Sequence, residues 1–258
     1  MIKVMSVNIR YGRAPDGENR WERRRRLALA RIQSFTPDLL GLQECRADGQ
    51  ARYVRRNLPG YDFYGVPRGG EGETALEMAP WLVRKTSFTI LEKGCFWLSE
   101  TPDLPGSRGW DGVFPRTVSW ARLRCSSSQR ELVYANTHFD YQPGAIDGAA
   151  GLLADWIDTW LPGLPVILTG DFNIGKDSPA YQRLTAPGRL MDALRLANPG
   201  QPDAGTFHAF GLPFIQAPID WLLVSEHFKA VEAGVETHRD GDLFPSDHYP
   251  IWAVLDWA

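Results

Sequence analysis

The chain has 258 residues, of which 43% are hydrophobic and 23% charged, and its formal net charge is −3. This length and composition allow one sizeable core, so we expect a single domain over residues 1–258. The lack of a basic excess argues against recruitment to long duplex DNA or an anionic membrane by bulk charge, although net charge hides how the charge is distributed.

The first part of the chain predicts a helix between two strands. The helix is expected to begin at Arg20, because Asn19 and Glu22 match a capping box, and to end before Pro37. The flanking strands are expected at Lys3–Ile9 and Asp38–Glu44.

A run of four arginines, Arg23 to Arg26, lies within this helix. We interpret the run as a solvated helix face, which is the usual place for such a charge run. A phosphate-binding edge is the alternative.

Most of the remaining elements are expected to be strands. A glycine-rich loop around Gly69, Gly70 and Gly72 comes first, and one helix is expected at Ala145–Trp160, where large apolar side chains recur at helical spacing. Many strands with few helices between them predict two packed sheets covered by helices. The apolar runs place these strands at Trp81–Lys85, Cys95–Ser99, Thr117–Cys125, Glu131–Phe139, Pro165–Thr169, Ile219–Val224, Ala230–Val235 and Ile251–Asp256.

The cysteines and the apolar runs indicate a cytoplasmic protein. Cys45, Cys95 and Cys125 are widely spaced and form neither a disulfide framework nor a zinc pattern, so reduced thiols are expected. The first residues lack the apolar run of a signal peptide, and no stretch approaches the roughly 18 apolar residues of a membrane helix. We therefore expect no membrane association, and nothing in the sequence indicates an obligate protein partner.

Polar side chains stand at the ends of the apolar strands, where sheet-based sites are commonly assembled. Their carboxylate and amide oxygens are hard ligands, which favour Mg²⁺ or Mn²⁺ over zinc. A histidine with a carboxylate partner can serve as an acid or a base. Each residue alone is equally well explained by a turn or a surface ion pair, so the interpretation depends on the whole set. The set is Asn8, Glu44, His138, Asp140, Asp171, Asn173, Asp220, Asp247 and His248.

Six motifs in this order resemble the endonuclease/exonuclease/phosphatase superfamily, and the stretch from Phe96 to Pro102 resembles a bacterial branch of small stand-alone members. The resemblance covers Lys3 to Leu255. It implies a DNase I-like α/β (α+β) four-layer sandwich, in which two packed, mostly antiparallel β-sheets are flanked by helices. The motifs are Ser6-Val7-Asn8, Gly41-Leu42-Gln43-Glu44, Asn136-Thr137-His138-Phe139-Asp140, Gly170-Asp171-Phe172-Asn173, Ile219-Asp220-Trp221 and Ser246-Asp247-His248.

The resemblance also implies which residues hold the metal and the attacking water. Glu44 is the expected principal metal ligand, with Asn8 and Asp247 close to the metal. Asp171 would orient or deprotonate the water, and Asn173 would hold the water or a phosphate oxygen.

The remaining implied roles concern the phosphate. His248, oriented by Asp220 through a hydrogen bond, would face the scissile phosphate, and His138 would hydrogen-bond a non-bridging oxygen. Further substrate contacts are expected from Arg68, Arg116, Asp140 and His208.

Two segments depart from the pattern of this branch. An Arg-Asp-Asp-Gly-like loop followed by Gly-Glu-Tyr is expected, and Arg68 and Glu77 are the best matches to it here. A basic residue is expected near the helix start, where Gly144 to Asp147 stand instead. Both departures lie where the substrate would be read, so they concern specificity more than catalysis.

The sequence therefore predicts a Mg²⁺- or Mn²⁺-dependent phosphodiesterase or nuclease in which water attacks phosphorus in line. The acidic balance favours a short oligonucleotide or a small phosphorylated molecule over long duplex DNA. A phosphomonoesterase acting on a sugar or inositol phosphate is the second hypothesis, because it would use the same core residues and differ in its loops. A binding protein that has lost catalysis is the third, and the intact core positions argue against it.

Overall fold

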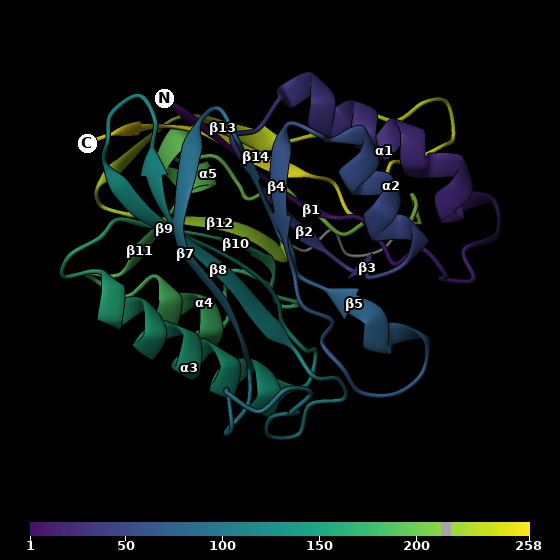
Figure 1. Ribbon diagram of the computed structural model, residues 1–258, viewed down its shortest axis with the longest axis horizontal. Helices are drawn as coiled ribbons and strands as arrows, with labels where there is room; N and C mark the ends of the chain where they lie inside the picture. Colours follow the sequence, from purple (N-terminus) through teal and green to yellow (C-terminus); the bar gives the residue numbers. More distant parts are fainter. Residues whose placement is uncertain (213–217) are drawn as a thin grey trace.

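Two β-sheets pack face to face between two layers of helices in the computed structural model, which describes residues 1–212 and 218–258 (Figure 1). The strand order in the first sheet is β13-β14-β1-β2-β6-β4, with β13 Phe228–Val235, β14 Ile251–Trp257, β1 Ile2–Asn8, β2 Leu39–Gln43, β6 Trp81–Arg84 and β4 Tyr61–Tyr64. The order in the second is β11-β12-β10-β9-β8-β7, with β11 Leu190–Asp192, β12 Asp220–Ser225, β10 Val166–Asp171, β9 Glu131–His138, β8 Thr117–Cys125 and β7 Phe88–Trp97. A separate ribbon pairs β3 (Cys45–Arg46) with β5 (Glu77–Met78).

Each sheet is antiparallel except for one central pair of parallel strands. In the first sheet β1 runs parallel to β2, with Asn8 opposite Gln43. In the second sheet β9 runs parallel to β10, with His138 opposite Asp171. Parallel neighbours need a crossover, which α1 (Trp21–Phe35) and α3 (Pro143–Trp160) supply. Asn8, Glu44, His138 and Asp171 thus stand at the carboxyl ends of the two parallel pairs.

Three apolar clusters make up the core and correspond to the three interfaces between four layers. One lies between the first sheet and the helices α1 and α2 (Gly49–Asn57). The second lies between the sheets, and the third lies between the second sheet and the helices α3 and α4 (Pro179–Leu184). The remaining short helices are α5 (Ala193–Ala197) and two 3₁₀ turns, Gly17–Asn19 and Glu73–Leu76. This arrangement confirms the predicted four-layer, DNase I-like fold.

A buried amide fastens the two sheets together behind the site. Asn136 on β9 donates from Nδ2 to the carbonyl oxygens of Leu42 at 2.8 Å and Pro80 at 2.9 Å, and its Oδ1 accepts from Gln43 Nε2 at 2.7 Å. A Cβ at Gly41 would collide with the Asn136 side chain, so the close approach requires glycine there. This contact fixes β2 and β9, which lead to Glu44 and His138, relative to each other.

The start of α1 differs from the prediction. The helix begins at Trp21, its cap residue Arg20 makes no side-chain capping bond, and Asn19 belongs to the preceding 3₁₀ turn, so the predicted capping box is wrong. The solvated-face interpretation fails at one arginine, because Arg24 is 0% exposed while Arg23 and Arg26 are exposed.

Other predicted elements agree in place and differ in length, and several short ones were not predicted. The strand β7 begins seven residues before its predicted start at Cys95, and α3 begins at Pro143 instead of Ala145. The helices α2, α4 and α5 are too short to give a clear apolar period. The three cysteines are free, as expected, and no helix in the described part of the chain is long and apolar enough to cross a membrane.

Candidate active site

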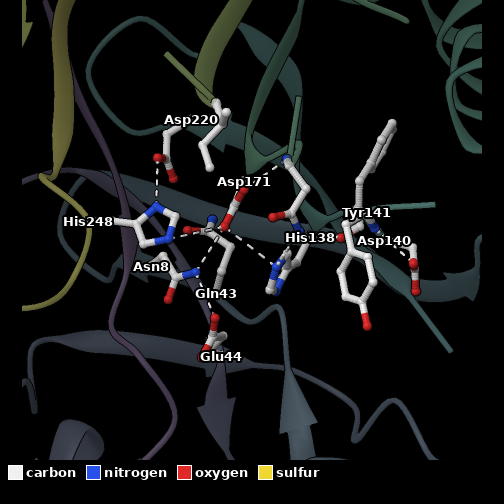
Figure 2. A network of polar contacts seen from close by, with 12 residues as sticks. Asn8, Gln43, Glu44, His138, Asp140, Tyr141, Asp171, Asp220 and His248 are labelled. Atoms are coloured by element: carbon white, nitrogen blue, oxygen red, sulfur yellow. Dashed lines mark hydrogen bonds and ion pairs between the residues drawn. The ribbon is translucent and has the colours of Figure 1, made fainter. Parts of the chain in front are cut away.

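The candidate site lies where the two parallel strand pairs end, one pair from each sheet (Figure 2). Asn8 at the end of β1 donates from Nδ2 to Glu44 Oε1 at 3.0 Å and to Asp171 Oδ2 at 2.9 Å. Glu44 directly follows β2 and has a φ of 57°, an unusual backbone conformation for glutamate that turns the chain at the strand end. Asn8 therefore joins carboxylates from both sheets, and the predicted convergence of the strand ends is confirmed.

His248 and Asp220 form the predicted hydrogen bond. Nδ1 of His248 lies 2.9 Å from Asp220 Oδ2, and its Nε2 lies 3.7 Å from Asp171 Oδ2. Burial lowers the pKa of His248, but the charges of Asp220 and then Asp171 outweigh it and raise the pKa to about 10. The ring is therefore an imidazolium at neutral pH, held between two carboxylates.

Asp171 lies at the centre of the cluster. Its Oδ1 accepts the backbone N–H of Asn173 at 2.9 Å, and burial followed by the charge of Asp220 raises its pKa. The side-chain Nδ2 of Asn173 lies 3.1 Å from His138 Nε2 and donates to the Phe139 carbonyl at 2.8 Å. Asn173 has a φ of 53°, which asparagine tolerates better than most residues.

The pKa of the second histidine, His138, is shifted in the opposite direction. His138 is buried, and burial, followed by the charges of Arg116 and Arg68, holds its pKa well below the ordinary value. One histidine in the site is thus neutral while the other is charged. Two titratable groups whose pKa values are driven apart are typical of an active site.

Two carboxylates on the same cavity fit a divalent cation. Glu44 and Asp247 both face Arg10, whose guanidinium lies 3.9 Å from Glu44 Oε2 and 3.5 Å from Asp247 Oδ2. Carboxylate oxygens are the hard donors that Mg²⁺ and Mn²⁺ prefer, and without a bound ion Arg10 supplies the positive charge beside them. Asp171, Asp220 and His248 also lie close enough together to hold an ion, but the hydrogen bond between Asp220 and His248 already uses two of their ligand atoms.

These groups open on a cavity of about 480 Å³ whose wall beside His138 is cationic and aromatic. Arg116 is 6% exposed, and its Nε finds no hydrogen-bond partner among the described residues; its nearest carboxylate, on Asp140, is 3.8 Å away. A buried guanidinium with unused donors beside a cavity favours an anion. The residues of this wall are Arg68, Thr74, Glu77, Phe114, Arg116 and Tyr141.

Comparison with known proteins identifies the family of the chain. Residues 5–248 match the Endonuclease/Exonuclease/phosphatase family. The chain belongs to this family.

The chain is similar to three proteins whose names indicate an activity or a family. An endonuclease/exonuclease/phosphatase of Bacteroides vulgatus is 30% identical, with a TM-score of 0.90, over 100% of this chain and 99% of that one. A mannosyl-6-phosphatase of Bacteroides thetaiotaomicron is 32% identical, with a TM-score of 0.87, over 99% of this chain and 100% of that one. The Ccr4 3'-5'-exoribonuclease subunit of the CCR4-Not complex of Phaeosphaeria nodorum is 27% identical over 155 residues, which are 53% of this chain and 26% of that protein.

Four predicted site residues do not line the cavity: Asn8, Asp140, His208 and Asp220. Asn8 and Asp220 instead hold side chains that do, namely Glu44, Asp171 and His248. Asp140 accepts the backbone N–H groups of Val113 at 3.1 Å and Phe114 at 2.9 Å, so it fixes the loop that carries Phe114 and Arg116. His208 is buried and stacks on the ring of Tyr249, with 4.0 Å between the ring centroids. Neither Asp140 nor His208 is among the side chains that face the cavity.

Several cavity residues were missed by the sequence reasoning. Arg10 and Tyr11 follow Asn8 almost directly, and Arg10 is held by Asp16 at 3.1 Å. Their closeness to the Asn8 motif was a signal that could have found them. Phe207 carries the same signal, because it stands beside the predicted His208, and it pairs with His248 in an isolated β-bridge; Phe210 carries no such signal.

Proposed function

We propose that this protein is a divalent-metal-dependent phosphomonoesterase that acts on a small phosphorylated molecule. One observation carries the proposal: the carboxylates, the charged His248 and the unsatisfied guanidinium of Arg116 all face one cavity of about 480 Å³. An arrangement with hard anionic donors on one side and cationic donors on the other suits a phosphate bound through a metal ion. Membership of a family that contains phosphoester hydrolases supports the reaction type.

The metal would be held by Glu44, with Asn8 and Asp247 beside it. Mg²⁺ or Mn²⁺ at such a site polarises a phosphoryl oxygen and stabilises negative charge on it. The hydrogen bonds that Glu44 already receives from Asn8 and from the backbone N–H of Tyr11 at 3.0 Å keep its carboxylate ionised and oriented.

The chain's own groups would orient the water and stabilise charge on the phosphate. Asp171, fixed by Asn8 and by the N–H of Asn173, presents a carboxylate of raised pKa that can orient the attacking water and accept its proton. The imidazolium of His248 supplies fixed positive charge where negative charge develops, and Asp220 keeps it protonated. Arg116, on the wall beside His138, would bind a non-bridging oxygen.

The likeness to the mannosyl-6-phosphatase supports a monoester over a diester. The mannosyl-6-phosphatase is similar over the full length of both chains, whereas the Ccr4 match covers about half of this chain. This reverses the order of the two hypotheses drawn from the sequence. The match to Ccr4 keeps a phosphodiesterase or nuclease as the second candidate.

A pair of aryl substrates separates the two candidates. With Mg²⁺ or Mn²⁺ present, we expect p-nitrophenyl phosphate to be hydrolysed with a higher kcat/KM than bis-p-nitrophenyl phosphate, and hexose 6-phosphates to be hydrolysed faster than oligonucleotides. A preference for the diester and for oligonucleotides would establish the nuclease alternative. Failure to hydrolyse any of these substrates with either metal would contradict the hydrolase assignment.

Glu44→Gln tests the metal site directly. The variant keeps the shape of the side chain and removes a hard anionic ligand, so we expect metal-dependent turnover to fall by at least about a hundredfold while the folded structure persists. Calorimetric titration with Mn²⁺ should show weaker binding in the same variant. Glu71→Gln, an exposed substitution away from the cavity, is the control. Parent-like Mn²⁺ affinity and turnover in Glu44→Gln would disprove the ligand assignment.

A further inference from the structure

The cavity wall beside His138 contains a buried carboxylate that the proposed reaction does not use. Glu77 begins β5, and its pairing with Arg46 of β3 places it two residues along that ribbon from Glu44. Its side chain is 5% exposed and lines the cavity. A buried acid at this position needs an explanation, because the cavity is otherwise suited to an anion.

Glu77 is held in place by one arginine. Arg68 Nη1 lies 3.2 Å from Glu77 Oε2, and this is the polar contact that the structure gives the carboxylate among the described residues. Arg68 is itself fixed, because its Nε donates to the Thr74 carbonyl at 3.0 Å and its guanidinium lies 4.4 Å from the centroid of the Phe114 ring. The pair is therefore a rigid part of the wall, with acceptor capacity left on the carboxylate.

The negative charge of ionised Glu77 disfavours a phosphate as the partner of its remaining acceptor oxygen. A carboxylate repels a phosphate oxygen, and the nearby carboxylate of Glu44 already disfavours a second negative charge. Burial, followed by the charge of Glu44, raises the pKa of Glu77 to about 7 despite Arg68. In either protonation state the group keeps an acceptor oxygen, so the partner that suits it is a neutral hydrogen-bond donor.

The neighbouring side chains suit the body of such a ligand. Phe114 and Tyr141 meet edge to face, with centroids 6.2 Å apart, and both line the cavity beside Arg68. Phe207 and Phe210 add apolar surface to the same cavity. Aromatic faces combined with a fixed acceptor suit a molecule that has C–H surface and hydroxyl groups on one frame.

We propose that Glu77 is a specificity-determining residue that accepts a hydrogen bond from a hydroxyl group of the leaving group, so that the preferred substrates are phosphomonoesters of polyols, sugars included. This inference rests on the proposed phosphomonoesterase function and adds which part of the substrate the protein recognises, a hydroxyl group of the leaving group. Glu77 contributes little to the hydrolysis of a phosphate ester without such a hydroxyl.

The test combines one substitution in the protein with the removal of one hydroxyl group from the substrate, and kcat/KM is measured for all four combinations. In Glu77→Gln the amide oxygen stays with Arg68, which turns the NH₂ group, a donor, toward the cavity. We expect kcat/KM for a hexose 6-phosphate to fall by about tenfold to a hundredfold, and that for p-nitrophenyl phosphate to change by less than about threefold. For one monodeoxy hexose 6-phosphate, which lacks the hydroxyl that Glu77 contacts, the kcat/KM of the parent should be lower by a similar factor. Glu77→Gln should not lower it further. Glu71→Gln, exposed in the same loop, should leave both substrates unaffected.

The outcomes are distinct. An equal fall for both substrates would mean that Glu77 acts only through Arg68 on the phosphate, and no fall for either would remove it from recognition; both overturn the inference. If Glu77→Gln does not fold, the deoxy series on the parent decides, because equal rates for all deoxy analogues also overturn it. Failure of the parent to hydrolyse any phosphomonoester, aryl or sugar, would instead contradict the proposed function itself.

Discussion

His248 is a buried cation whose charge depends on one neighbour. Its Nδ1 lies 2.9 Å from Asp220 Oδ2. Burial lowers the pKa of His248, and the charge of Asp220 is the largest influence that raises it, to about 10. Asp220 begins β12 opposite Asp171 of β10, so the strand pairing places both carboxylates on the imidazole. In the proposed mechanism this charge stabilises the transition state, so it should govern the alkaline limit of activity.

Asp220→Asn should lower kcat and move the alkaline limb of the pH–rate profile. Without the charge of Asp220 the pKa of His248 falls, so the protonated, active form is lost at a lower pH than in the parent. We expect kcat at neutral pH to fall by about a hundredfold with a smaller change in KM, because the charge acts mainly on the transition state. Asp242→Asn, an exposed change in the loop before His248, is the control. An unchanged kcat together with an unchanged alkaline limb would exclude the pair from catalysis.

At the scale of elements, α1 does more than cover the first sheet. Arg24, in the first turns of the helix, donates to the Ile9 carbonyl at 2.6 Å, the Arg10 carbonyl at 2.9 Å and the Pro245 carbonyl at 3.2 Å. Ile9 directly follows Asn8, and Pro245 precedes Asp247 by two residues. The helix therefore ties together the two loops that bring metal-site residues from β1 and from the start of β14.

Arg24→Met should lower the free energy of unfolding. The substitution leaves buried carbonyl groups without donors, and we expect the free energy of unfolding in urea to fall by about 3 kcal/mol. Arg26→Met, an exposed change two residues away, should alter it by less than about 0.5 kcal/mol. Arg24→Lys should recover part of the stability, because an ammonium can still donate to some of the carbonyls. Equal stability of the Arg24 and Arg26 variants would contradict the proposed role of Arg24 in holding the two loops.

At the scale of the whole molecule, we expect the fold not to depend on the proposed metal. The core consists of three apolar clusters that fill the spaces between the four layers. The carboxylates of the site already have protein donors: Glu44 accepts from Asn8 and Tyr11, and Asp171 accepts from Asn8 and Asn173. A bound ion would add only the stability that follows from its own affinity.

Chelation with EDTA should abolish turnover while the protein stays folded. We expect the far-ultraviolet circular dichroism at about 25 °C to be unchanged and thermal unfolding to remain one cooperative transition, as the predicted single domain requires. The melting temperature should fall by only a few degrees, the amount that weak ion binding contributes. Readdition of Mg²⁺ or Mn²⁺ should restore turnover. Loss of the circular dichroism signal on chelation would show that the ion is structural.

Local sequence patterns were enough to predict the strand ends and the residues that stand there. Apolar runs that finish in Asn8, Glu44 or Asp171 are visible in the sequence because strand burial follows the chain's own periodicity. The many strands with few helices between them also predicted two packed sheets. The resemblance to one superfamily then supplied the four-layer, mostly antiparallel arrangement and the pairing of Asp220 with His248. The roles of these residues in catalysis stay predictions until the variants above are measured.

Only the tertiary structure decided which polar residues are buried and which face the cavity. Arg24 looks the same in sequence as Arg23 and Arg26, and its burial follows from a loop 221 residues away. Asn8 and Asp171 meet across 163 residues, and Glu77 reaches the cavity through the pairing of a two-residue ribbon. Packing against distant segments sets the burial and the partners of a side chain. The local periodicity of the sequence carries no information about those contacts.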